Sequence, residues 1–167
     1  MPRAPGELLA ARAAMPFATH ILVPTDFSQA SELAVEAAAA LARQIGAKLT
    51  LVHVHDPEAL RPPATIGWSD ERQETVEKEI ERAVDQSFAD LKKERLAGVE
   101  IADTVILHDS SPAHAICAYA ETIGADLVVI ATHGRTGLKH LLIGSVAERV
   151  VRHSSVPVLT LRSSARD

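Results

Sequence analysis

The sequence predicts an α/β fold: a single domain with a five-stranded parallel open sheet and helices on both faces. Short apolar runs typical of strands alternate with longer segments whose apolar residues recur at helical spacing, in the order βαβαβαβαβ. The chain has 167 residues, which favours one domain, and 47% of them are hydrophobic, which is enough for a sizeable core. A single cysteine excludes an intrachain disulfide, so we expect a reducing, cytoplasmic compartment.

The first two predicted strands flank a helix with clear boundaries. The apolar run 21–23, ended by Pro24, is the first strand. Ser28 is a favourable N-cap for the helix that follows, and Gly46 is a favourable residue to end it. Residues 48–55 form the second predicted strand.

A long charged helix and an edge strand follow. Prolines and a glycine make 56–68 a loop, and Ser69 caps the helix after it. Charged side chains cover most of that helix, which indicates a solvated surface. The third strand is predicted over 99–107, where partial polar alternation indicates an edge. The apolar stripe of the helix consists of Val76, Ile80, Val84, Phe88 and Leu91.

The last third of the chain supplies two more helices and two more strands. Ser111 and Pro112 are typical of a helix start, as N-cap and first helical residue. Residues 127–130 are apolar on both faces and predict a central strand. The last strand is predicted over Val156–Leu161, where Pro157 favours an edge position. The buried face of the last helix is predicted to be Val146, Ala147, Val150 and Val151.

The predicted strand order places one crevice at the centre of the sheet. Strands one and four are the least polar, so we place them side by side in the order 3-2-1-4-5. Ligands of open α/β sheets bind outside the carboxyl ends of the strands, where the strand order reverses. Thr25 and Asp26 follow strand one there, and residues 131–134 follow strand four.

The loop after strand four has the chemistry of a phosphate site. Backbone N–H groups can approach an anion closely at Gly134, and the first turn of the helix at Gly144 and Ser145 leaves N–H groups unpaired. Nearby Arg135, Lys139 and His140 offer positive charge. An ordinary strand-to-helix loop with Ser145 as its cap would have the same spacing, and spacing alone leaves both interpretations open.

Several motifs together resemble the universal stress protein family over residues 17–162. The ATP-binding branch of that family has the motif G-x2-G-x9-G-[ST], and Gly134 and Gly144-Ser145 match its later elements. Ala131 replaces its first glycine; the added methyl is tolerable if φ is negative there and costly if φ is positive. The resemblance is carried by Pro24-Thr25-Asp26-Phe27-Ser28, His53-Val54, Ser111-Pro112, Thr132-His133-Gly134-Arg135-Thr136-Gly137-Leu138 and Leu142-Ile143-Gly144-Ser145-Val146-Ala147-Glu148.

The resemblance implies a Rossmann-like, adenine nucleotide α-hydrolase-like fold and an ATP-binding regulatory protein, with or without Mg²⁺. It implies a domain over 17–163, preceded by a flexible extension (1–16) and followed by a tail (164–167). It also implies a homodimer formed by antiparallel pairing of strand five. Asp26 would contact the adenosine moiety, Val54 would form an apolar wall beside adenine, and His133 would contact the nucleotide. The implied site residues are Pro24, Thr25, Asp26, Val54, Ala131, Thr132, His133, Gly134, Arg135, Gly137, Gly144, Ser145, Val146 and Ala147.

Four of the singled-out side chains also have purely structural explanations. Asp26 could instead cap the helix that begins at Ser28, where carboxylates are favoured. His53 and His55 face the same side of a strand, so a metal pair is conceivable, but polar residues at a strand end are the favoured interpretation. Cys117 lies on the apolar face of a helix and is predicted to be packed core.

Net charge and hydropathy argue against nucleic-acid and membrane partners. The net charge of −5 argues against non-specific binding to nucleic acid or to an anionic membrane surface. The longest apolar run is far too short to span a bilayer.

Other functions fit the residues less well. Cleavage of ATP between its α and β phosphates would call for a glycine-rich loop after strand one, where this chain has Pro24–Ser28. A phospho-accepting receiver would need an acidic pair and a lysine after strand five, and the chain offers Asp26 and Arg162. No general base is evident, so any ATP hydrolysis should be slow. An interaction module with a vestigial site remains the alternative, and Ala131 is the residue that favours it.

Overall fold

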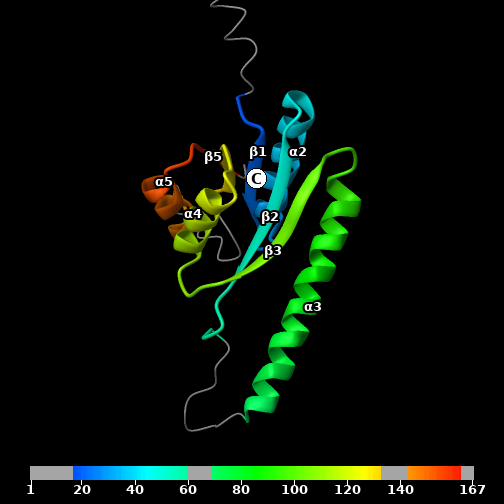
Figure 1. Cartoon of the computed structure of the whole chain (residues 1–167), viewed down its shortest axis with the longest axis vertical. Coiled ribbons are helices and arrows are strands. Elements are labelled where there is room, and N and C mark those ends of the chain that lie inside the picture. Colours follow the sequence, from blue (N-terminus) through cyan, green and yellow to red (C-terminus); the bar gives the residue numbers. More distant parts are fainter. Residues whose placement is uncertain (1–16, 60–68, 133–142, 163–167) are drawn as a thin grey trace, which may run out of the picture.

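A computed structural model describes residues 17–59, 69–132 and 143–162, and it has the predicted architecture. Five parallel strands form one sheet in the order β3-β2-β1-β4-β5, so the two strands predicted to be edges are edges (Figure 1). The elements are β1 (His20–Pro24), α2 (Gln29–Ile45), β2 (Lys48–His55), α3 (Asp70–Arg95), β3 (Ile101–His108), α4 (Pro112–Thr122), β4 (Leu127–Ala131), α5 (Ser145–His153) and β5 (Val158–Leu161).

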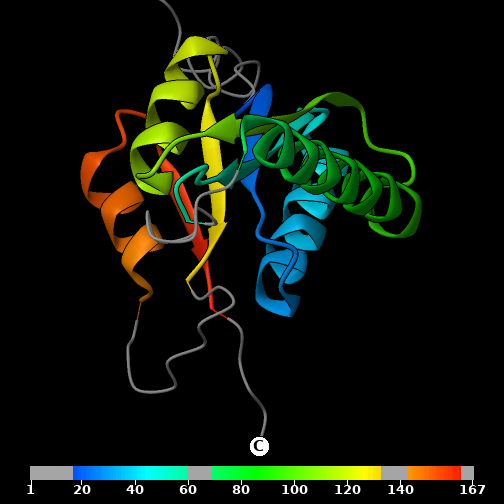
Figure 2. The same cartoon turned by 90° about the horizontal axis from the view of Figure 1, so that it is seen from below.

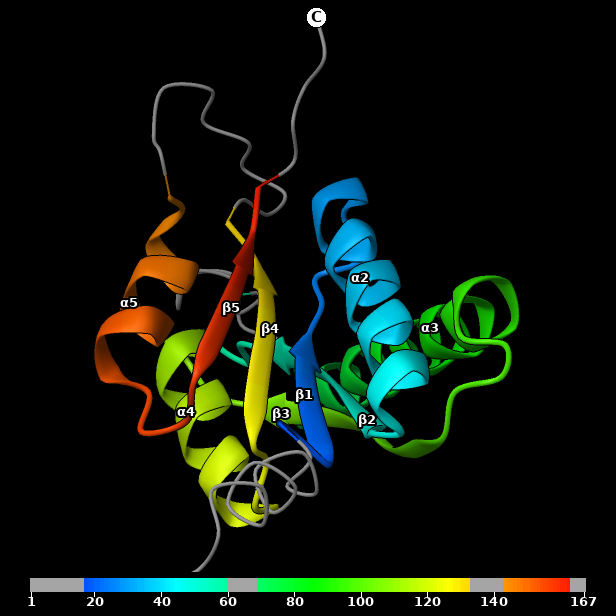
Figure 3. The ribbon, with the colours of Figure 1, turned by 90° about the horizontal axis from the view of Figure 1, so that it is seen from above.

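Two helical layers cover the sheet. Helices α2 and α3 lie on one face, and α4 and α5 lie on the other (Figures 2 and 3). Because side chains alternate along a strand, β1 sends Ile21 and Val23 into the first core and Leu22 into the second. All three side chains are fully buried, which is what a central strand requires.

The boundaries of the first two described helices have clear local causes. The Ser28 hydroxyl accepts a hydrogen bond from Ser31 N–H at the start of α2, and Gly46 ends that helix with φ +71°. The Ser69 hydroxyl does the same for Arg72 N–H at the start of α3. On α3 the predicted stripe is buried only in its second half, because the first half projects past the edge of the sheet (Figure 1).

Two predicted strand starts and one predicted buried position were wrong. Strand β3 starts at Ile101, two residues later than predicted. Pro157 precedes β5 and does not interrupt it; its carbonyl accepts a hydrogen bond from Val128 N–H, a contact that needs no N–H from proline. Val151 is 48% exposed, because one residue beyond the buried Val150 turns the helix by about 100° away from the core.

A polar cluster joins the amino ends of β1 and β4. Asp126 accepts hydrogen bonds from the N–H and hydroxyl of Thr19 and from His20 N–H, at 2.7, 2.6 and 3.0 Å, and these bonds lower the pKa of its carboxyl. The buried His20 ring bonds to the Thr50 hydroxyl at 2.8 Å. Burial, and secondarily the charge of Lys48, lowers the pKa of His20. This polar cluster lies at the end of the sheet opposite to the predicted crevice.

None of the helices among the described residues has the length and apolar character needed to cross a bilayer.

Candidate functional site

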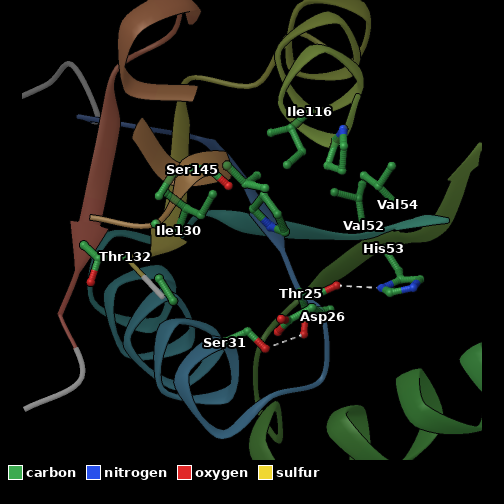
Figure 4. Close-up of a pocket in the computed structure, with 16 residues that line it drawn as sticks. Thr25, Asp26, Ser31, Val52, His53, Val54, Ile116, Ile130, Thr132 and Ser145 are labelled. Atoms are coloured by element: carbon green, nitrogen blue, oxygen red, sulfur yellow. Dashed lines mark hydrogen bonds between the residues drawn. The ribbon is translucent and has the colours of Figure 1, made fainter. Parts of the chain in front are cut away.

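A pocket of about 340 Å³ opens at the carboxyl ends of β1, β2 and β4, at the crevice that the strand order predicted (Figure 4). Its size falls in the usual range of small-molecule sites. Ten of the predicted site residues line it: Pro24, Thr25, Asp26, Val54, Ala131, Thr132, Gly144, Ser145, Val146 and Ala147. The other four, His133, Gly134, Arg135 and Gly137, lie outside the described residues, as do Lys139 and His140.

The remaining lining residues were missed from the sequence, although two simple rules point to two of them. Val52 is two residues before Val54 and therefore faces the same side of β2. Ile116 lies one helical turn after Pro112, at the start of the helix that the sequence had already located. The missed residues are Ser31, Val52, His53, Pro112, Ile116 and Ile130.

Hydrogen bonds to β2, within the turn and to α2 hold the residues that follow β1. The N–H of Thr25 donates to Val52 carbonyl at 2.8 Å, which extends the sheet by one residue. The Thr25 hydroxyl accepts from Phe27 N–H at 3.0 Å and lies 3.1 Å from the Ser31 hydroxyl. Thr25 is therefore buried, and its hydrogen bonds hold this part of the pocket wall in place.

Asp26 hydrogen-bonds within the turn before α2 and also lines the pocket. Its Oδ1 accepts a hydrogen bond from Ser28 N–H at 3.0 Å, directly before α2. The half-buried residue also lines the pocket. The N-cap itself is Ser28, so Asp26 closes the turn before the helix and leaves the capping of α2 to Ser28. Asp26 is the one charged side chain among the described lining residues.

Apolar side chains form the body of the pocket. They come from strands and helices and lie on one face of the sheet, and Figure 4 shows the labelled ones around the cavity above Thr25 and Asp26. They are Val52, Val54, Ile116, Ile130 and Val146. A flat apolar group of a ligand would be shielded from water between them.

At the start of α5, one backbone N–H that was predicted to face a phosphate already has a partner. Gly144 is the N-cap, and its N–H donates to Thr132 carbonyl, so it is not available to a phosphate in this conformation. Ser145 is the first helical residue and not a cap. Because the first helical bond runs from Glu148 to Gly144 carbonyl, the N–H groups of residues 145–147 have no helical acceptor. These three N–H groups, with the helix dipole, make this end of the pocket attractive to an anion.

Ala131 satisfies the condition under which its methyl group is tolerable. Among the described residues other than glycine, only Phe27 has a positive φ, so Ala131 has a negative one. It is the last residue of β4, pairs in register with Leu161, and is 8% exposed. An alanine at this position therefore causes no backbone strain.

The histidines at the end of β2 make contacts with neighbouring parts of the protein. The Nδ1 of His53 donates to Thr25 carbonyl at 2.8 Å, and its ring packs on Phe27 at 5.0 Å. The His55 ring lies 5.8 Å from the ring of His108. No group of three histidine, cysteine or acidic side chains among residues 17–59, 69–132 and 143–162 is placed to hold a metal ion.

Cys117 is half-buried against the second core, close to its predicted position. Burial, with a smaller contribution from the charge of Glu121, raises the pKa of its thiol. A raised pKa lowers the thiolate fraction, so the geometry does not favour a reactive cysteine.

The chain matches the model of the universal stress protein family over residues 18–162. The universal stress protein MJ0531 of Methanocaldococcus jannaschii is 31% identical over 155 residues, which cover 88% of this chain and 84% of that protein. The solved structure of MJ0577 from the same organism superposes with a TM-score of 0.75 at 27% identity and covers 90% of this chain and 99% of its own. A universal stress protein solved in complex with cAMP has a TM-score of 0.54 at 25% identity and covers 86% and 96%.

Proposed function

Because the chain belongs to the universal stress protein family, we propose that it binds an adenine nucleotide, ATP above all, in the pocket between β1 and β4. The observation that carries the proposal is the distribution of groups along this pocket. A carboxylate and an apolar wall from β1, β2 and α4 line one part of the pocket, and the N-terminus of α5 lines another. These two parts match the adenosine and the phosphates of a nucleotide.

The adenosine end is assigned to Asp26 and the apolar wall. A carboxylate can accept hydrogen bonds from two hydroxyls or from an exocyclic amine. Val52 and Val54 from β2 and Ile116 from α4 supply the apolar surface against which a base can pack. The complex of a related protein with cAMP supports an adenine nucleotide as the ligand class.

The phosphate end is assigned to the first turn of α5. Three N–H groups without helical acceptors can bind phosphate oxygens, and the Ser145 hydroxyl adds a donor. Gly134 and Arg135 complete this end in the proposal, from outside the described residues. Where Mg²⁺ accompanies ATP, phosphate oxygens and retained water molecules are expected to be among its ligands.

Bound nucleotide is proposed to act as a regulatory ligand. A ligand shifts a conformational equilibrium only by its difference in affinity for the two states. Hydrolysis, where it occurs, would be slow and secondary to binding.

Titration calorimetry with ATP tests the proposal. The Asp26→Ala variant should bind ATP at least about tenfold more weakly, because a charged hydrogen-bond partner is worth roughly 1.5–3 kcal/mol. Asp56→Ala is the matched control: Asp56 accepts from Glu58 N–H in an equivalent turn at 2.9 Å but does not line the pocket. Its affinity should stay within about twofold of the wild type. Absence of ATP binding by the wild type would favour an interaction module with a vestigial site.

A homodimer through β5 is proposed as well. This strand is an edge, and Leu159 on it is 41% exposed. An apolar edge strand is a surface that proteins cover or pair. Leu159→Lys should convert a dimeric mass to a monomeric one in light scattering at micromolar concentration. Ala102→Lys, at an exposed position on the opposite edge strand, should leave the mass unchanged. A monomeric wild type would refute the proposal.

A further inference from the structure

Phe27, next to Asp26 in the pocket wall, has an unusual backbone. Its φ is +60°, a left-handed value that no other non-glycine residue in the described part of the chain has. Side chains with a Cβ are disfavoured there, and a bulky aromatic residue is a genuine outlier. A conformation of this kind persists only where the surroundings enforce it, and such positions cluster at functional sites.

Two rings enforce it. Phe27 packs edge-on against Phe88 of α3 at 5.3 Å and tilted against His53 of β2 at 5.0 Å. Phe88 is 2% exposed, so this contact belongs to the core. His53 in turn donates through Nδ1 to Thr25 carbonyl, two residues before Phe27. The turn is thus held from β2 and from α3 at once.

The same turn sets the direction of the Asp26 side chain. The hydrogen bond from Ser28 N–H to Asp26 Oδ1 spans Phe27, so its geometry depends on the φ of Phe27. A shift of Phe27 toward an ordinary backbone conformation would break this bond and turn the carboxylate. Phe27 and Phe88 do not line the pocket themselves.

We propose that Phe27 is a positioning residue for Asp26, and that α3 controls nucleotide affinity through the contact between Phe88 and Phe27. This inference rests on the proposed function, because Asp26 is the residue whose placement is controlled. It gives α3, which projects beyond the sheet, a physical connection to the pocket (Figure 1).

The comparison of Phe27→Ala with Phe27→Gly tests the proposal most directly. Both variants lose the ring, but alanine keeps the penalty for positive φ and glycine does not. ATP affinity measured by calorimetry should fall about tenfold in Phe27→Ala and stay within about threefold in Phe27→Gly. Equal losses in the two variants would overturn the proposal, because they would show that the backbone conformation is irrelevant.

The contribution of α3 is tested by Phe88→Leu beside Leu91→Ala. Both positions are buried on α3, and both variants should unfold more easily, but of the two only Phe88 supplies the ring that packs on Phe27. Phe88→Leu should weaken ATP binding about fivefold, whereas Leu91→Ala should not change it. In a Phe27→Gly background Phe88→Leu should have no further effect, since a turn without strain needs no support. A fivefold loss that persists there, or one shared by Leu91→Ala, would contradict the proposal.

Hydrogen exchange at the Ser28 amide separates this inference from the proposed function. Measured without ligand, exchange should be faster in Phe27→Ala than in Phe27→Gly, because the bond to Asp26 is lost in the former. If the wild type fails to bind ATP, the proposed function fails while this ordering still decides whether Phe27 positions Asp26. The opposite ordering would overturn the positioning role whatever the wild type binds.

Discussion

Replacing Ala131 by glycine restores the first position of the ATP-binding motif, and we expect it to improve binding very little. The usual reason for glycine at such a position is a positive φ or a close approach of backbone to ligand. Ala131 has a negative φ and sits in a regular strand, paired with Leu161. Glycine gains nothing from its conformational freedom here, so ATP affinity should stay within about threefold of the wild type.

The cost of Ala131→Gly to stability can be worked out from the same geometry. The methyl group is nearly buried, at 8% exposure, and its loss removes about 0.8 kcal/mol of hydrophobic stabilisation. Glycine within a strand adds about 0.5–1 kcal/mol of conformational entropy cost. The sum is about 1.5 kcal/mol, which lowers the Tm of a domain of this size by about 3–6 °C.

Calorimetry measures both quantities, by scanning for Tm and by titration for ATP affinity. Ala102→Gly is the control for the strand effect alone, because Ala102 lies on β3 and is exposed. It should lower the Tm by less than Ala131→Gly does. A gain in ATP affinity of tenfold or more in Ala131→Gly would refute the reasoning, since it would mean that the methyl group obstructs the nucleotide.

Three further predictions concern stability away from the pocket. Asp126→Ala should lower the free energy of unfolding by about 1–2 kcal/mol at pH 7, a value discounted for exposure, because three donors lose their acceptor. Because the native pKa of Asp126 is lowered, the difference from the wild type should vanish as the pH falls through that pKa, as measured by chemical denaturation. The pKa of His20 is also lowered in the native state, so the unfolded chain takes up its proton first as the pH falls. The wild type should therefore lose stability below about pH 6.5, and His20→Gln should show a smaller loss. Gly46→Ala should cost about 1 kcal/mol in the same assay, from its φ of +71° alone, because no atom lies within 4 Å of the added methyl; an unchanged stability would contradict the left-handed helix end.

Most of the fold was predictable because its signals are local. The hydrophobic spacing of each segment and the residues at helix ends, such as Ser28, Gly46 and Ser69, depend only on neighbours in the chain. Strand polarity then gave the order of the sheet. The errors fell where a boundary depends on a neighbouring strand, as at Pro157, whose carbonyl is engaged by β4 while its ring stays outside β5.

The site was predictable in part. The strand ends carrying Asp26 and Ala131 were placed at one crevice by topology, and the structure brings both into one pocket. Ile130 was missed because no motif marks an apolar wall, which is assembled from separate elements.

The sequence by itself determined that a strand, a glycine-bearing loop and a helix N-terminus follow one another near the end of this chain, because each depends on short-range pattern. Only the tertiary structure decided how the backbone on both sides of the pocket is held. The N–H of Gly144 is taken by Thr132, and the backbone of Phe27 is held left-handed by rings from β2 and α3. Both outcomes depend on contacts between segments distant in the sequence, which residue spacing cannot encode.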